Sequence, residues 1–115
     1  MQGFAMTEEP EPTGDELVRV LATLSNPHRL RVIAALSRES TYVSELARSL
    51  GISRALLQVH LRKLEAAGLV SARLEVSEDG KAMKFYEVNR FAIRLTPEAI
   101  EAAERTLTPD TKGNT

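Results

Sequence analysis

The segment of residues 50–70, LGISRALLQVHLRKLEAAGLV, constrains the fold of this 115-residue chain more than any other. Gly51 and Gly68 each stand where a helix can end, because glycine readily takes the left-handed conformation that closes a helix. Ser53 follows the first of these glycines and is placed to cap a new helix over about residues 54–67. We therefore predict that one helix ends at the first glycine and that a second helix runs between the two.

The two sides of the second helix differ in character. Because a helix turns roughly 100° per residue, Leu57, Leu61 and Leu64 fall together and form a core-facing stripe. The opposite side collects small, hydrogen-bonding and basic side chains: Ala55, Gln58, Val59 and Arg62, with Lys63 at its edge. Amide and guanidinium groups can bind base edges or phosphates of DNA. We interpret this side as a DNA-reading surface; the alternative is a solvated surface on which apolar residues are merely tolerated.

The neighbouring elements complete a known motif. The helix before Gly51 has an apolar side made of Val43, Leu46, Ala47 and Leu50. Two helices joined by a short glycine-containing turn form a helix-turn-helix. After Gly68 the apolar residues recur at every second position, which predicts a half-exposed strand over residues 69–76. Its apolar side holds Val70, Ala72, Leu74 and Val76. SEDGK then supplies an Asp-Gly turn and MKFYEV a returning strand, so a hairpin directly follows the motif.

Two further helices are predicted before this region and one after it. The first spans about residues 15–24, and the second begins where Asn26 can cap and Pro27 suits the first helical position. The residues of the second helix that we expect to face inward are Leu30, Ile33, Ala34 and Leu36. The last helix begins at Thr96 and Pro97 in the same way. The predicted fold class is mainly α with a small antiparallel β-hairpin, in the order four helices, two strands, one helix.

Charge is distributed unevenly along the chain. Taken alone, the net charge of −1 argues against a nucleic-acid partner. However, residues 17–94 hold 13 Lys and Arg against 7 Asp and Glu, a balance of +6. Acidic residues predominate before residue 17 and after residue 94. Local charge decides which surface attracts phosphate, so the basic middle of the chain suits a DNA-binding protein.

Composition limits the other classes. We predict one domain over residues 15–107, between a disordered acidic arm of residues 1–14 and a disordered tail of residues 108–115. Met6 is an alternative start to Met1. No cysteine is present, which excludes disulfides and thiolate metal sites. Because no segment has the length of a membrane span or the core of a signal peptide, we expect a cytoplasmic protein without membrane partners.

In their order along the chain and in their amino-acid sequences, these segments resemble the winged helix-turn-helix regulators of the ArsR type. The resemblance rests on SNPHRLRVIAAL, VSELARSLGISRALLQVHLRKLEAAGLV and GKAMKFYEV, and it covers about residues 15–107. It implies a homodimeric transcriptional repressor, usually released by a ligand, whose first and last helices pair. Its two recognition helices would read a near-palindromic operator. The implied dimer interface consists of Leu17, Val18, Val20, Leu21, Leu24, Ile100, Ala103 and Leu107.

Together with the helix side described above, the resemblance assigns the DNA contacts to the recognition helix and the hairpin. The implied DNA-binding residues are Ser53, Arg54, Ala55, Gln58, Val59, His60, Arg62 and Lys63 on the helix, and Arg73, Lys81 and Lys84 on the hairpin. For His60, two roles are open: a phosphate contact or a partly buried structural residue. Each of the three hairpin residues either contacts the DNA backbone or minor groove or is simply a solvated charge. Pro27, Arg29 and Arg31 match the opening of the family's second helix, where we expect packing, with phosphate contact as an open alternative, and no catalysis.

The chain departs from the metal-sensing members of that family. Where they carry cysteines on the first helix of the motif, this chain reads STYVSELA, and its last helix has Glu98, Glu101 and Glu104 but no histidine. His28 and His60 lack ligand-type spacing. We therefore predict no metal site and no cofactor. An organic ligand, a partner protein and protein abundance all remain open as the signal that relieves repression.

Two alternatives stand beside a DNA-binding repressor. The same helix face could bind a protein, and MarR-type regulators share the pattern on a usually longer chain. An enzyme is not expected, because the sequence shows no glycine-rich phosphate loop, no catalytic triad order and no paired carboxylates of a cleft. The predicted partners are double-stranded DNA, a second copy of the chain and an unidentified small-molecule effector.

Overall fold

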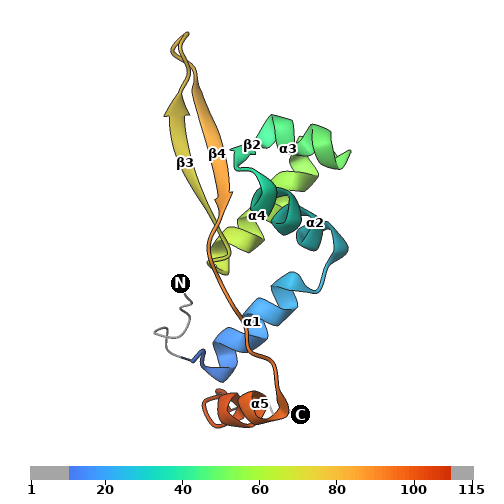
Figure 1. The fold of residues 1–115 in the computed structure, drawn as a ribbon, viewed down its shortest axis with the longest axis vertical. Coiled ribbons are helices and arrows are strands. Elements are labelled where there is room, and N and C mark those ends of the chain that lie inside the picture. The colour runs from blue at the N-terminus through green and yellow to red at the C-terminus, as the bar shows by residue number, and fades with distance from the viewer. Residues whose placement is uncertain (1–10, 110–115) are drawn as a thin grey trace. The chain divides into compact units, whose positions relative to one another are not determined.

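The computed structural model describes residues 11–109, which form two compact units. One unit consists of residues 22–90, and the other of residues 11–21 together with 91–109. Most of the predicted arm and tail lie outside the described residues, so the domain boundaries at 15 and 107 stay a prediction. The elements follow the predicted order, with one additional short strand (Figure 1). This confirms the mainly α fold with an antiparallel hairpin.

The larger unit contains α2 (Pro27–Arg38), α3 (Val43–Leu50) and α4 (Arg54–Ala66). Asn26 caps α2 as predicted, because its Oδ1 accepts hydrogen bonds from the backbone N–H groups of His28 at 2.9 Å and Arg29 at 3.3 Å. Such a cap satisfies donors that the first helical turn leaves without partners. α3 ends at Gly51, which has a left-handed φ of 70°, so the predicted boundary between the motif helices is confirmed.

The core of this unit lies between these helices and the base of the sheet. Its most deeply buried side chains are Val32, Leu36, Leu46, Leu57, Leu61, Leu64, Val70 and Tyr86. The prediction for α2 was partly wrong, since Leu30 is 54% exposed and Ala34 is exposed as well. Leu36 is buried as predicted, and Ile33 is half-buried. The other buried residue of α2 is Val32, which lies about 160° around the helix from Leu30.

Three strands form the sheet, in the order β2-β4-β3. β3 (Val70–Val76) and β4 (Ala82–Val88) make the predicted hairpin, which we call the wing. The additional strand, β2 (Thr41–Tyr42), pairs antiparallel with β4 and places Tyr42 opposite Phe85. The wing extends well beyond the helices of its own unit (Figure 1). There Leu74 and Val76 are 69% and 73% exposed, so the apolar side predicted for β3 is covered only near the base.

The smaller unit contains most of α1 (Gly14–Leu24) together with α5 (Pro97–Glu104). α1 begins so close to the end of α5 that a Cβ on Gly14 would lie 2.3 Å from the carbonyl oxygen of Ala103. The Gly14 N–H donates to Thr106 Oγ1 at 2.7 Å. As predicted, Thr96 caps α5, because its Oγ1 accepts from the N–H of Ala99 at 3.0 Å. Only a residue without a side chain permits this close approach of the two helices.

Candidate nucleic-acid interface

Helix α4 is held by its buried side and by its cap. Leu57, Leu61 and Leu64 are all 0% exposed, as the leucine stripe predicts. Ser53 Oγ accepts a hydrogen bond from the N–H of Leu56 at 3.1 Å, which confirms the predicted N-cap. Burying one leucine side chain contributes about 1.5–3 kcal/mol. Turning α4 about its axis would forfeit much of that stabilisation, so the direction of its outer face is fixed.

The outer face of α4 is open to solvent. Gln58 is half-buried, and the exposed members of the predicted set are Ser53, Arg54, Ala55, Val59, Arg62 and Lys63. Leu56, which the sequence analysis did not single out, is also 40% exposed. The helix carries three Lys or Arg against one Glu. The face therefore offers positive charge, hydrogen-bond donors and a few apolar contacts, which is the chemistry that DNA grooves and phosphates accept.

A cleft of about 220 Å³ connects α4 with the wing. Its lining comes from the start of α3, the first turns of α4 and the strand β4: Tyr42, Val43, Ser44, Arg54, Gln58, Ala82, Met83 and Lys84. The fold thus brings together Arg54 and Lys84, which are distant in the sequence. Two cations and an amide that line one cleft can hold an anionic oxygen such as that of a phosphate.

Arg73 is engaged within the wing. Its Nε lies 3.0 Å from Glu75 Oε2 and its Nη1 lies 3.0 Å from Glu87 Oε1. Its guanidinium carbon stands 4.4 Å from the centre of the Phe85 ring. These hydrogen bonds raise the pKa of Arg73, and the bond to Glu87 has the larger effect. The hairpin register explains the arrangement, because Arg73 is directly opposite Phe85 on the paired strand.

Tyr42 joins the same network from β2. Its hydroxyl donates to Glu75 Oε1 at 3.2 Å, and its ring meets that of Phe85 edge-on with centroids 5.1 Å apart. Burial, followed by the hydrogen bond to Glu75, raises the pKa of Tyr42. No role for Tyr42 was predicted from the sequence, because a strand of two residues has no periodic pattern. The network ties the wing to the segment that leads into α3.

The two predicted lysines of the wing are in a different situation. Lys81 and Lys84 are both exposed, and Lys84 Nζ stands 5.9 Å from the centre of the Tyr86 ring. Residues 70–88 contain three Lys or Arg against four Asp or Glu, a balance of −1. The wing as a whole is therefore not basic, and only its lysines present positive charge away from the Arg73 network.

His60 lies beneath the outer face and is only 5% exposed. Its Nδ1 accepts a hydrogen bond from Arg29 Nε at 3.2 Å, and its ring centroid is 5.2 Å from that of His28. Burial, and then the charges of Arg29 and His28, lower the pKa of His60 below its ordinary value of 6.5. The imidazole is thus neutral near pH 7, and its burial favours the structural role over the phosphate contact.

Arg29 connects this histidine to the rest of the unit. Besides His60, it contacts the carbonyl oxygen of Thr23, to which Nη1 donates at 3.2 Å. The side chain therefore links the entry to α2 with the underside of α4. Packing, rather than phosphate contact, accounts for the position of Arg29.

No arrangement of three or more His, Asp or Glu residues suited to a metal ion occurs within residues 11–109. Within the same range, no helix is long and apolar enough to cross a membrane.

Comparison with known proteins identifies the family. A model of bacterial regulatory proteins of the arsR family matches residues 26–72. An HTH-type transcriptional regulator of Methanocaldococcus jannaschii is 35% identical over 86 residues, which cover 75% of this chain and 90% of that protein. The chain belongs to the ArsR family. A biofilm growth-associated repressor of Xylella fastidiosa is also similar, with 31% identity over 71 residues that cover 62% of each protein.

Solved structures agree with this assignment of the ArsR-family chain. The homodimeric winged helix-turn-helix DNA-binding domain of a Mycobacterium bovis protein matches it with a TM-score of 0.58 and 27% identity, over 64% of each chain. The protein is accordingly a transcriptional regulator with a DNA-binding winged helix, as the sequence resemblance predicts, and the MarR-type alternative is set aside. The matched segment 26–72 contains both helices of the motif.

Lowering the pH should destabilise this ArsR-family protein through His60. Between its lowered folded pKa and 6.5, the unfolded chain binds more protons at this site than the folded chain does. The contribution of His60 to the free energy of unfolding should therefore be fully present above pH 6.5. It should decrease as the pH falls below that value. Urea unfolding at a series of pH values measures this. His60→Gln keeps an acceptor for Arg29 but cannot titrate, so its free energy of unfolding should lack the pH dependence that His60 contributes. A variant with the parent's pH profile would contradict the assignment of this pH dependence to His60.

Proposed function

We propose that this ArsR-family regulator is a homodimeric repressor that binds a near-palindromic operator through the outer face of α4. The observation that carries the proposal is the leucine-anchored α4, which turns Ala55, Val59 and Arg62 away from the core. The same helix leaves Arg54 exposed at its first position. The major groove of B-DNA accepts an α-helix. A relative named as a repressor supports the direction of regulation, and a homodimeric structural neighbour supports the assembly.

The proposed contacts divide between bases and phosphates. Arg54 and Gln58 stand in the first turns of α4, the part of a recognition helix that usually meets base edges. Val59 can contact a thymine methyl group, and Ala55 and Ser53 permit close approach of the backbone. Arg62 and Lys63, further along the helix, are assigned to phosphates. The cleft between Arg54 and Lys84 would hold a further phosphate, because it joins two cations.

The wing is proposed to bind DNA through lysines alone. Lys81 and Lys84 are exposed, whereas both edges of the Arg73 guanidinium contact carboxylates. An arginine neutralised in this way adds little to the attraction for phosphate. We therefore assign Arg73 to holding β3 against β4, although the sequence resemblance placed it among the DNA contacts.

The dimer is proposed to form through α1 and α5. Four apolar side chains of these helices and their ends are exposed in the single chain: Val18 at 56%, Leu21 at 38%, Ile100 at 50% and Leu107 at 41%. Leu17 and Ala103, which the resemblance also assigns to the interface, are already buried, and Val20 and Leu24 are half-buried. A two-fold pairing would cover the exposed members with their own copies in a partner chain.

The remaining parts of the proposal concern location and partners. Because its partner is chromosomal DNA, the cytoplasmic location predicted from the sequence is retained. A protein partner for α4 is the rival occupant, since Leu56 and Val59 are each 40% exposed. Salt dependence separates the two, because neutralising phosphates releases counterions and makes affinity fall steeply as salt rises.

Removing a base contact should reduce the preference for the operator. We expect Arg54→Ala and Gln58→Ala each to cost about 1–3 kcal/mol of discrimination between the operator and random duplex. Competitive gel-shift titration measures this. Arg48→Ala is the matched control, because it removes an exposed arginine of α3 that pairs with Glu45. If both α4 variants discriminated as well as the parent does, the assignment of the reading face would be wrong.

Within the wing, lysine and arginine should behave differently. Lys81→Ala should weaken binding to all duplexes similarly and reduce the slope of log affinity against log salt by about 1. Arg73→Ala should leave that slope nearly unchanged, since Glu75 and Glu87 already neutralise the guanidinium. Fluorescence anisotropy at several salt concentrations measures both slopes. A larger loss of slope for Arg73→Ala than for Lys81→Ala would reverse the assignment.

A charge on the exposed stripe should separate the dimer without unfolding the chain. Leu21→Glu places a carboxylate on a side chain that is 38% exposed in the single chain but would be desolvated in the pair. Light scattering should give half the parent's mass, with an unchanged circular dichroism spectrum. Arg19→Glu is the control, because it introduces a carboxylate at an exposed position roughly 160° around α1 from Leu21. A dimer of unaltered mass for Leu21→Glu would refute the proposed interface.

A further inference from the structure

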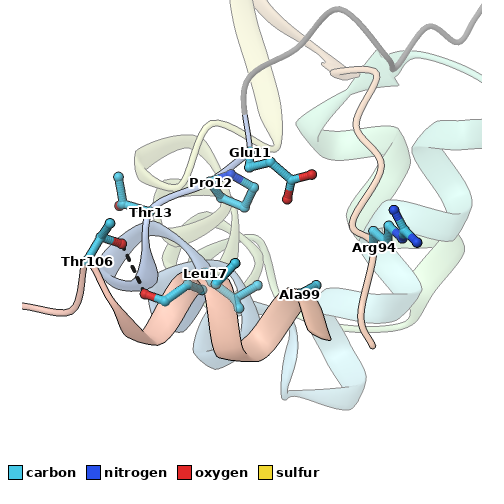
Figure 2. A pocket seen from close by; sticks show the side chains of 9 residues that line it. Glu11, Pro12, Thr13, Leu17, Arg94, Ala99 and Thr106 are labelled. Carbon is cyan, nitrogen blue, oxygen red and sulfur yellow. Dashed lines mark hydrogen bonds between the residues drawn. The ribbon is translucent and has the colours of Figure 1, made fainter. Parts of the chain in front are cut away.

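The smaller unit contains a pocket that the proposed DNA and dimer contacts do not explain. Its volume is about 170 Å³, close to the roughly 150 Å³ of an engineered protein cavity that admits benzene. It is lined by Glu11, Pro12, Thr13, Leu17, Arg94, Ala99, Ala102, Ala103 and Thr106 (Figure 2). All of these residues belong to one unit. The pocket therefore has room for a small organic molecule.

The apolar part of the pocket comes from both helices. Leu17 and Ala103 are each 8% exposed and form its most buried part. Ala99 and Ala102 extend this surface along α5, and their small side chains leave the space that larger residues would fill. A short aliphatic group matches such a surface, because it replaces water on apolar atoms without needing a hydrogen bond.

Two opposite charges line the same pocket. Glu11 and Arg94 are both exposed, and neither forms an ion pair with another residue of the range 11–109. The other polar groups are already engaged: Thr13 Oγ1 accepts from the N–H of Glu16 at 3.1 Å, and Thr106 Oγ1 donates to the carbonyl of Ala103 at 3.0 Å. The groups left to bind a ligand are one carboxylate and one guanidinium.

The alanine surface does not coincide with the exposed stripe of α5. At roughly 100° per residue, Ala99 lies about 100° and Ala102 about 160° around the helix from Ile100. Ile100 is half exposed, at 50%, and belongs to the proposed dimer contact. One helix can therefore present its stripe to a partner chain and its alanines to a ligand.

We propose that this pocket binds a small zwitterion, an α-amino acid with a short aliphatic side chain. Arg94 binds the carboxylate through its fork of N–H donors, Glu11 binds the ammonium group, and the side chain lies on Leu17 and the alanines of α5. A ligand in this position contacts the segment before α1, α1 itself and α5 together. It would stabilise the pairing of these helices within the chain, whether or not the protein represses transcription.

L-valine is a suitable probe, tested on the full chain without DNA. Titration followed by amide NMR should shift the resonances of Ala99, Ala102 and Ala103 and saturate, with a rise in Tm. Isovalerate lacks the ammonium group and isobutylamine lacks the carboxylate, while both keep the branched aliphatic group of valine. Each should bind about tenfold or more weakly, because one charge-assisted contact is missing. Equal binding of either analogue, or no saturable shift with valine, would overturn the proposal.

Variants locate the site. Arg94→Gln and Glu11→Gln should each weaken valine binding about tenfold, whereas Arg105→Gln and Glu101→Gln remove like charges elsewhere on the unit and should not. Ala102→Leu fills the pocket from an exposed position and should abolish binding while Tm without ligand stays near that of the parent. If valine bound Ala102→Leu as it binds the parent, the ligand would lie elsewhere and the proposal would fail.

Discussion

The burial of the leucines on one side of α4 is the interaction on which the function of this regulator depends. Leu57, Leu61 and Leu64 are each 0% exposed and share a core with α2, α3 and the base of the sheet. Because the same helix supplies the core and the binding face, its orientation is set by packing before any DNA is met. Preorganisation of this kind reduces the entropy lost on binding, so the backbone that carries the outer face needs little further ordering.

A second constraint is that charge acts locally. The chain carries a net charge of −1, and even the wing is slightly acidic, yet α4 has three Lys or Arg against one Glu. Attraction for phosphate falls off within a Debye length of about 8–10 Å at moderate ionic strength. Arg54, Arg62 and Lys84 therefore decide the attraction of their surface for phosphate more than the net charge of the chain does. Within α4 and the wing, the positive charge therefore comes from the helix and the wing lysines, because carboxylates hold Arg73.

Local chemistry allowed most of the fold to be predicted. Caps at Asn26, Ser53 and Thr96 depend on neighbouring residues, and the leucine stripe of α4 depends on one helical period, so all of these appear in the sequence. Contacts between distant segments do not. The strand of Thr41 and Tyr42 exists only because β4 lies beside it. For the same reason, no pattern in the sequence indicates that Glu87 neutralises Arg73 or that Glu11 and Arg94 share a pocket. The buried side of α2 was partly misplaced because Leu30 and Val32 are both apolar, and only packing distinguishes them.

Selection of bound sequences from a random duplex pool, with the purified protein at moderate salt, tests the central claim most directly. Two α4 helices related by two-fold symmetry should enrich inverted half-sites whose centres are separated by one helical turn of about 10–10.5 base pairs, or a multiple of it. Recovery of such a motif would support major-groove reading by the outer face of α4 in a symmetric pair. A pool without any enriched sequence after repeated rounds, or one enriched only for a single unrepeated site, would contradict it.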